Sequence, residues 1–328
     1  MSALTPSIAG IEAAAERLRG IALMTPLIEN AEINERAGGR VLLKAETLQH
    51  CGSFKFRGAY NKMSQLTAEE RRRGVLAWSS GNHAQGVARA GKILGVPAVI
   101  VMPKDAPAIK AERVKADGAE IILYDRYTDD RETIGRRIAD ERRLVLAPSY
   151  DDIDIIEGQG TLALEAVLQA RALGVSLDSV IVPCGGGGMT AGCALALEAR
   201  SPQTQMWIAE PQFYDESWAS ISSGEKRRAD TKKPTLCDAI ATPAPGDLTL
   251  PIMRRLVRGG ASVSDEDVSF AIAFAFKYLK LVVEPGGAAG LAAALAGKIE
   301  TKGKTVGVVL SGGNIDPGLF AEMLKRHG

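Results

Sequence analysis

Short apolar runs alternate with stretches of helical spacing along most of this 328-residue chain, and this alternation restricts the fold more than any other feature. The runs lie at 75–78, 97–102, 120–124, 144–147, 179–183, 206–209 and 305–310. A strand that is apolar throughout is buried on both faces, and a helix between successive strands makes them parallel. The alternation therefore predicts the α/β class, with doubly wound parallel sheets. Because the chain is longer than one hydrophobic core usually absorbs, we expect two domains or one large α/β domain.

Two other parts of the chain give different signals. Helices are expected near 249–257 and over 265–279, and Ser264 is the expected cap of the second. The segment 214–245 is polar and irregular, so no element is predicted there.

The charge balance and the cysteines exclude several classes of protein. The sequence has 40 basic and 39 acidic residues, so there is no electrostatic basis for binding nucleic acid or an anionic membrane. It lacks the apolar core of a signal peptide, and no apolar run reaches the length of a membrane span. Its four cysteines form no CxxC pair, which fits a reducing compartment. We expect a cytoplasmic enzyme with a small-molecule substrate.

Lys55 differs from the other lysines because Phe54 and Phe56 flank it and Arg57 follows. Flat apolar side chains remove water from an amine, and a neighbouring cation repels its proton. Both effects lower a lysine pKa and favour its action as a nucleophile or base near neutral pH. Alone this pattern decides little, since most lysines beside aromatic residues extend along the surface with the amine in water.

Polar turns at the ends of expected strands are the next candidates, because ligands bind at the carboxyl ends of strands in doubly wound sheets. The turn 79–83, Ser-Ser-Gly-Asn-His, offers hydroxyl groups and free amide N–H groups at a helix start. Such a turn suits a carboxylate, and an ordinary helix cap explains it equally well. The turns 284–289 and 311–314 have a similar composition, and each is also a plausible loop.

Four consecutive glycines, 185–188, lie between the run 179–183 and a predicted helix. Their backbone can wrap closely round a group, and their amides can surround a phosphate. The run is neither a Walker motif nor the GxGxxG dinucleotide fingerprint. A phosphate cradle is the better interpretation, and a tight structural turn is the alternative.

These motifs occur in a specific order: Ser-Phe-Lys at 53–55, Ser-Gly-Asn-His at 80–83, the glycine run, and Ser-Gly-Gly-Asn at 311–314. With them the chain resembles the fold-type-II pyridoxal-phosphate enzymes, which have the tryptophan synthase beta-like fold. It is most similar to their threonine/serine dehydratase and serine racemase branch. The resemblance extends over almost the whole length of the chain.

The resemblance implies a role for each motif. Lys55 carries pyridoxal phosphate as a Schiff base and then acts as the general base. Asn82 bonds the 3′-oxygen of the cofactor, and Ser311 bonds its pyridine nitrogen. The implied cofactor-binding residues are Phe54, Lys55, Asn82, Gly185, Gly186, Gly187, Gly188, Met189 and Ser311. The implied substrate-binding residues are Ser79, Ser80, Gly81, Asn82, His83, Arg131 and Ala239.

The implied reaction is an α,β-elimination in which a dehydratase, or ammonia-lyase, converts a β-hydroxy amino acid to a 2-oxo acid and ammonia. Ser80 occupies the position where the racemase branch keeps a catalytic serine on the opposite face of the cofactor. Arg131 either binds a second carboxylate of the substrate, as in a 3-hydroxyaspartate, or is a surface residue. Ala239 stands where the family usually has glycine, so serine or threonine cannot simply be carried over as the substrate.

A metal site is also implied by the resemblance. Glu210, Tyr214 and Glu216 lie where relatives bind a structural Mg²⁺ or Ca²⁺ through two carboxylates and a carbonyl. Oxygen ligands suit such hard cations, but Glu216 replaces the usual aspartate and alters the geometry.

By resemblance, residues 1–64 and 153–328 form a large cofactor-binding domain, and residues 65–152 form a small mobile domain that closes over the substrate. A homodimer is implied as well. The sequence stops soon after 311–314, so a catabolic enzyme without a regulatory domain is expected. The alternatives are a serine or aspartate racemase, a dehydratase of hydroxyectoine breakdown on the same scaffold, and a non-catalytic ligand-binding relative.

Overall fold

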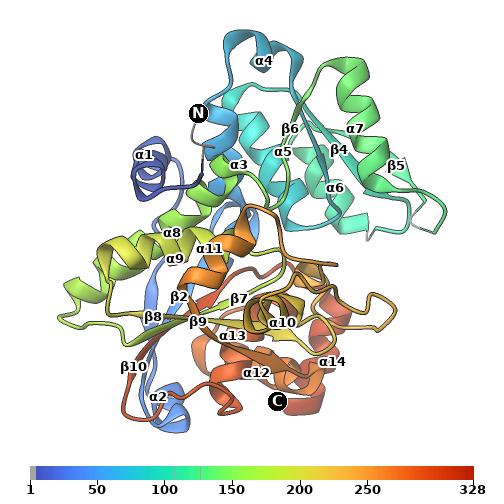
Figure 1. Cartoon of the computed structure of the whole chain (residues 1–328). Helices are drawn as coiled ribbons and strands as arrows, with labels where there is room; N and C mark the ends of the chain where they lie inside the picture. Colours follow the sequence, from blue (N-terminus) through green and yellow to red (C-terminus); the bar gives the residue numbers. More distant parts are fainter. Residues whose placement is uncertain (1–4, 107, 126) are drawn as a thin grey trace.

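The computed structural model describes residues 5–106, 108–125 and 127–328, which form two sheets (Figure 1). The first has six strands in the order β1-β2-β10-β7-β8-β9, and the second has four in the order β5-β4-β3-β6. Strand β1 is antiparallel to β2, and the other neighbours are parallel. The strands are β1 Leu27–Glu29, β2 Arg40–Ala45, β3 Val75–Trp78, β4 Ala98–Pro103, β5 Glu120–Tyr124, β6 Val145–Leu146, β7 Ser179–Pro183, β8 Gln205–Pro211, β9 Val257–Val263 and β10 Thr305–Leu310.

Helices pack on both faces of the six-stranded sheet. Helices α2, α12, α13 and α14 share one core with it, and α1, α8, α9 and α11 share another. The helices are α1 Ile8–Leu18, α2 Ala31–Ala37, α3 Lys55–Ser64, α4 Ala68–Arg73, α5 Asn82–Leu94, α6 Ala108–Ala116, α7 Arg131–Arg142, α8 Ile153–Ala172, α9 Gly188–Arg200, α10 Glu216–Ser223, α11 Thr249–Leu256, α12 Asp265–Phe274, α13 Pro285–Leu295 and α14 Pro317–His327. Of the helices described, none is long and apolar enough to cross a membrane.

Strand β7 illustrates how the apolar runs produce this arrangement. Ile181 belongs to the core under α12 and α13, whereas Val180 and Val182 belong to the core under α8 and α9. Successive side chains of a strand point to opposite faces, so a strand between two layers of helices must be apolar at every position. This confirms the predicted α/β class with doubly wound sheets.

The four-stranded sheet is covered in the same way. Helices α3 and α5 pack on one face, with Val114 of α6, and Ile138 of α7 packs on the other. In Figure 1 this sheet and its helices lie above the six-stranded sheet, and α3 passes beside both α5 and α8. Helix α3 therefore packs against a helix of each sheet, and it begins at Lys55.

The sequence predicted three elements incompletely. Helix α10 lies within the segment where no element was predicted, and the helix expected over 265–279 ends as an α-helix at Phe274 and continues as a π-helix, Ala275–Leu279. Strand β9 begins at Val257, the last residue of a predicted helix, and contains Gly259 and Gly260. A Cβ at Gly259 would lie 2.2 Å from the Trp207 ring, so glycine is needed for the indole to cover the strand.

Candidate active site

The predicted cofactor and substrate residues line one cavity at the carboxyl ends of β3, β7 and β10. The predicted residues in its lining are Phe54, Lys55, Ser79, Ser80, Gly81, Asn82, His83, Arg131, Gly185, Gly186, Gly187, Gly188, Met189, Ala239 and Ser311. The structure thus brings together every residue predicted for these two roles, although they are spread over more than 250 positions of sequence. Such a site fits the rule that ligands bind at strand ends of parallel sheets.

Backbone contacts place Lys55 beside Ser311. The amide of Phe54 donates to the carbonyl of Ser311 at 3.1 Å, and the amide of Gly313 donates to the carbonyl of Gly52 at 2.9 Å. The segment before α3 is therefore paired with the segment after β10. Because these hydrogen bonds join backbone atoms, the spacing of the two segments does not depend on side-chain rotamers.

The amine of Lys55 is held within the cavity. Its Nζ atom donates to the carbonyl of Ser149 at 2.6 Å and lies 5.2 Å from the centre of the Phe54 ring. Burial lowers the pKa of Lys55 from 10.5 to about 8, against the opposing attraction of Glu284. Phe56, the other predicted neighbour, instead packs in the core with Tyr60, because consecutive helical residues point in different directions.

This shift has a measurable consequence for cofactor attachment. Only the neutral amine attacks an aldehyde, and at pH 7.5 a pKa of about 8 rather than 10.5 raises the neutral fraction on the order of a hundredfold. If Lys55 attaches pyridoxal phosphate, as the resemblance implies, the rate at which the cofactor-free protein forms this covalent link is expected to rise with pH and level off above about 8. Stopped-flow absorbance would measure it, and a rate still rising tenfold per pH unit at pH 9.5 would contradict the lowered pKa.

The glycine run has no room for side chains. A Cβ at Gly186 would lie 2.4 Å from the ring of Tyr150, and Gly187 has a φ of 91°, in the left-handed region that other residues rarely adopt. The run leads directly into α9, so its amides stand at a helix N-terminus that faces the cavity. Closely approachable amides at a helix start fit a phosphate group, so the run can hold the phosphate of a cofactor.

The turn 79–83 links β3 to α5, and two of its side chains are fixed by distant residues. Asn82 donates to Glu284 at 2.5 Å and accepts from Asn314 at 2.8 Å. The His83 ring bonds the carbonyl of Ala147 at 2.7 Å. Burial, with the nearby charge of Lys55, lowers the pKa of His83 to about 3, so this histidine is neutral and not an acid at physiological pH.

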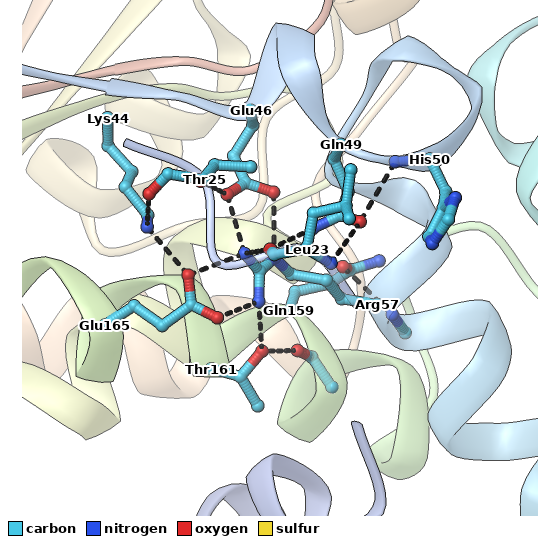
Figure 2. Close-up of polar contacts among 12 residues, drawn as sticks. Leu23, Thr25, Lys44, Glu46, Gln49, His50, Arg57, Gln159, Thr161 and Glu165 are labelled. Carbon is cyan, nitrogen blue, oxygen red and sulfur yellow. Dashed lines mark hydrogen bonds and ion pairs between the residues drawn. The ribbon is translucent and has the colours of Figure 1, made fainter. Parts of the chain in front are cut away.

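Helix α3, which presents Lys55, is anchored by a buried ionic cluster of Lys44, Glu46, Arg57 and Glu165 (Figure 2). Arg57 forms two hydrogen bonds with Glu46, at 2.8 and 2.9 Å, and two with Glu165, at 2.7 and 2.8 Å. Lys44 donates to Glu165 at 2.7 Å. The cluster joins β2 and α8 to the first turn of α3, two residues beyond Lys55.

The three residues predicted to bind a metal lie outside the cavity lining. Glu210 accepts from the amides of Ser217 and Trp218, and its pKa is raised by burial and by Glu216. Burial raises the pKa of Glu216 to about 7, and its Oε2 atom has no partner among the described residues. Tyr214 donates its hydroxyl to the carbonyl of Lys233. Two buried carboxylates fit a hard cation, and the metal site stays a prediction.

Sequence reasoning missed Tyr150 and Glu284 as contributors to the cavity. Tyr150 follows β6 after three residues, so the rule that ligands bind at strand ends could have found it. Glu284 was noted only as part of a helix-opening turn, and its contact with Asn82 spans 202 positions. Nothing in the local sequence indicates such a long-range pair.

The chain matches the protein-family model described as pyridoxal-phosphate dependent enzyme over residues 19–312. It is 42% identical to an L-threo-3-hydroxyaspartate ammonia-lyase of a Pseudomonas species, over 95% of this chain and 96% of the relative. It is 41% identical to an enzyme of the same name from Saccharomyces cerevisiae, over 98% and 97%. The solved structure of maize serine racemase superposes with a TM-score of 0.92, at 36% identity, covering 99% of this chain and 98% of the other.

These similarities confirm the predicted enzyme class, a pyridoxal-phosphate dependent ammonia-lyase. They agree with the geometry, in which a lysine of lowered pKa and four consecutive glycines line one cavity. This chain belongs to the fold-type-II pyridoxal-phosphate dependent enzymes, in the branch of the ammonia-lyases and serine racemases.

Proposed function

We propose that this protein is an ammonia-lyase for L-threo-3-hydroxyaspartate, which it converts to oxaloacetate and ammonia. The observation that carries the proposal is the position of Arg131, which lines the same cavity as Lys55 and the turn 79–83. A cavity with an anion-binding turn and a separate guanidinium suits an amino acid with two carboxylates. Two relatives above 40% identity carry the name of this activity.

The proposed roles follow from the contacts. The turn 79–83 binds the α-carboxylate through amide N–H groups at the start of α5. Lys55, neutral in part near pH 7.5, removes the α-proton. Bound pyridoxal phosphate supplies the electron sink for the charge that develops at the α-carbon. Asn82, fixed by Glu284 and Asn314, and Ser311 would hold the cofactor ring, and the glycine run would hold its phosphate.

The proposal includes finer points from the sequence. Residues 1–64 with 153–328 and residues 65–152 are proposed as the two domains, and the two separate sheets support this division. A structural Mg²⁺ or Ca²⁺ at Glu210, Tyr214 and Glu216 is also proposed, because a cation would compensate the two buried carboxylates, whose charges oppose each other. A homodimer and a cytoplasmic location stay predictions.

Removing the guanidinium should change which substrate is used. Arg131→Gln is expected to lower kcat/KM for L-threo-3-hydroxyaspartate by about tenfold to a few hundredfold, because a charged hydrogen bond to the second carboxylate is lost. Its kcat/KM for L-serine, which has no second carboxylate, is expected to stay within about twofold. Ammonia release from both substrates measures this, with Arg137→Gln on the exposed face of α7 as the matched control.

If Arg131→Gln kept the wild-type ratio of kcat/KM for 3-hydroxyaspartate to that for serine, Arg131 would no longer support the proposed substrate. If wild-type protein releases ammonia from L-serine or L-threonine but not from any isomer of 3-hydroxyaspartate, the proposed substrate is wrong.

A racemase is the second candidate, and Ser80 is the observation that favours it. This hydroxyl lines the cavity with Lys55, and two proton-carrying groups near one α-carbon are what inversion requires. Chiral analysis of recovered substrate separates the two functions. Inversion of serine or aspartate that is much faster than ammonia release would replace the lyase proposal with the racemase.

A further inference from the structure

Tyr150 has a fixed position beside the glycine run. A Cβ at Gly186 would lie 2.4 Å from its ring, and a Cβ at Gly188 would lie 2.9 Å from its Cα atom. The aromatic ring therefore packs directly on the loop that opens α9. A tyrosine ring held in this way has little freedom, so its hydroxyl is directed by the fold and not by the ligand.

The hydroxyl of Tyr150 is available to a ligand. Tyr150 lines the same cavity as Lys55 and Arg131 and is partly exposed to it. In the part of the chain that the structure describes, no hydrogen bond of this hydroxyl to another residue is found. Other polar side chains of the lining are engaged: Asn82 with Glu284 and Asn314, His83 with Ala147, and Thr242 with Glu216.

The charges around Tyr150 make it a hydrogen-bond donor. Burial raises its pKa, the negative charge of Asp151 adds to this, and the positive charge of Arg131 opposes it. The phenol is thus protonated near neutral pH, and it lies close enough to Arg131 to be affected by that charge. A protonated phenol and a guanidinium that face one cavity are complementary to a carboxylate.

We propose that Tyr150 is a specificity-determining residue, whose hydroxyl binds the distal carboxylate of a dicarboxylic amino acid together with Arg131. The α-carboxylate lies at the turn 79–83 and the α-carbon at Lys55, so the rest of the substrate extends toward the remaining donors of the lining. Arg131 supplies charge, and Tyr150 supplies a donor in a fixed direction. This inference rests on the proposed function, because it names what recognises the second carboxylate.

Tyr150→Phe tests the hydroxyl and keeps the ring that packs on Gly186. The holoenzyme variant is expected to show kcat/KM for L-threo-3-hydroxyaspartate lowered by about 10- to 150-fold, mainly through KM, since a hydrogen bond to a charged group is lost. For L-serine, which has no second carboxylate, the fall in kcat/KM is expected to be much smaller, so that the preference for 3-hydroxyaspartate over serine falls about tenfold or more. Tyr278→Phe, a tyrosine outside the cavity lining, is the control and is expected to match the wild-type protein on both substrates.

Calorimetric binding of two unreactive acids gives a readout that does not depend on turnover. Succinate has two carboxylates and butyrate has one on the same number of carbons. The wild-type protein is expected to bind succinate more tightly, and Tyr150→Phe should weaken succinate binding about tenfold or more while leaving butyrate binding unchanged.

The outcomes distinguish this inference from the proposed function. An unchanged succinate affinity in Tyr150→Phe, or an equal loss on 3-hydroxyaspartate and serine, overturns the role of Tyr150 even if the wild-type protein is a hydroxyaspartate ammonia-lyase. If the wild-type protein does not turn over 3-hydroxyaspartate, the proposed function fails. The succinate comparison would then still decide whether Tyr150 recognises a second carboxylate.

Discussion

Lys55→Ala is expected to lose all covalent attachment of pyridoxal phosphate and at least about 10⁴-fold in turnover. Among the described residues, Lys55 is the one lysine in the cavity lining, and burial lowers its pKa so that its amine is partly neutral near physiological pH. With the roles proposed for Lys55, the variant would lose both the nucleophile that binds the cofactor and the base that takes the α-proton. Mass spectrometry after borohydride reduction measures attachment, and ammonia release measures turnover.

Lys62→Ala is the matched control, because Lys62 lies near the other end of α3 and pairs with Asp152. It is expected to keep the reducible adduct. The glycine run does not depend on Lys55, so Lys55→Ala should still bind the cofactor without a covalent link. An adduct that persists in Lys55→Ala at another lysine would show that the assignment of the cofactor lysine is wrong.

The parts of the fold set by local chemistry could be predicted from the sequence. The strands at 75–78, 179–183 and 305–310 have the predicted bounds, because a strand buried on both faces is largely apolar along its length. The edge strand at 120–124 also has the predicted bounds, although Glu120 and Leu123 are exposed. Strand β9 was missed because Gly259 and Gly260 are unfavourable in a strand by local preference. They are needed there because the Trp207 and Trp218 rings, from other elements, lie directly over them. Tertiary packing there overrides the local preference.

The same division applies to the site. The motifs that carry Lys55, the glycine run and Ser311 could be found because each follows a strand or opens a helix, where ligands bind. The partners of these residues could not be found. The bond of Asn82 to Glu284 and the packing of Tyr150 on Gly186 join positions far apart in the sequence, and no local spacing specifies them.

The ionic cluster around Arg57 could not be predicted either, although Arg57 belongs to the motif that identified Lys55. Arg57 and Glu46 are both wholly buried. Burial acts to raise the pKa of Glu46, but the charge and hydrogen bonds of Arg57 outweigh it and leave that pKa lowered. The two carboxylates and two cations balance, so each charge depends on partners from other elements.

Arg57→Met is expected to lower the free energy of unfolding by about 3–5 kcal/mol, because it leaves the buried carboxylate of Glu46 without its cation. Arg137→Met, which breaks an exposed pair with Glu141, should cost less than about 1 kcal/mol. Denaturation in urea of the cofactor-loaded variants measures both. If Arg57→Met lost no more free energy of unfolding than the control, water or a rearrangement would have to compensate the charge of Glu46.

The double variant Arg57→Met with Glu46→Gln separates the cost of an uncompensated charge from the loss of packing. It removes one positive and one negative charge and leaves Lys44 paired with Glu165 at 2.7 Å. The double variant is therefore expected to be more stable than Arg57→Met alone, since no buried carboxylate lacks a partner. If the two variants were equally stable, the loss in Arg57→Met would come from the missing contacts of Arg57 with Glu165 and Thr161. The uncompensated charge of Glu46 would then not be its cause.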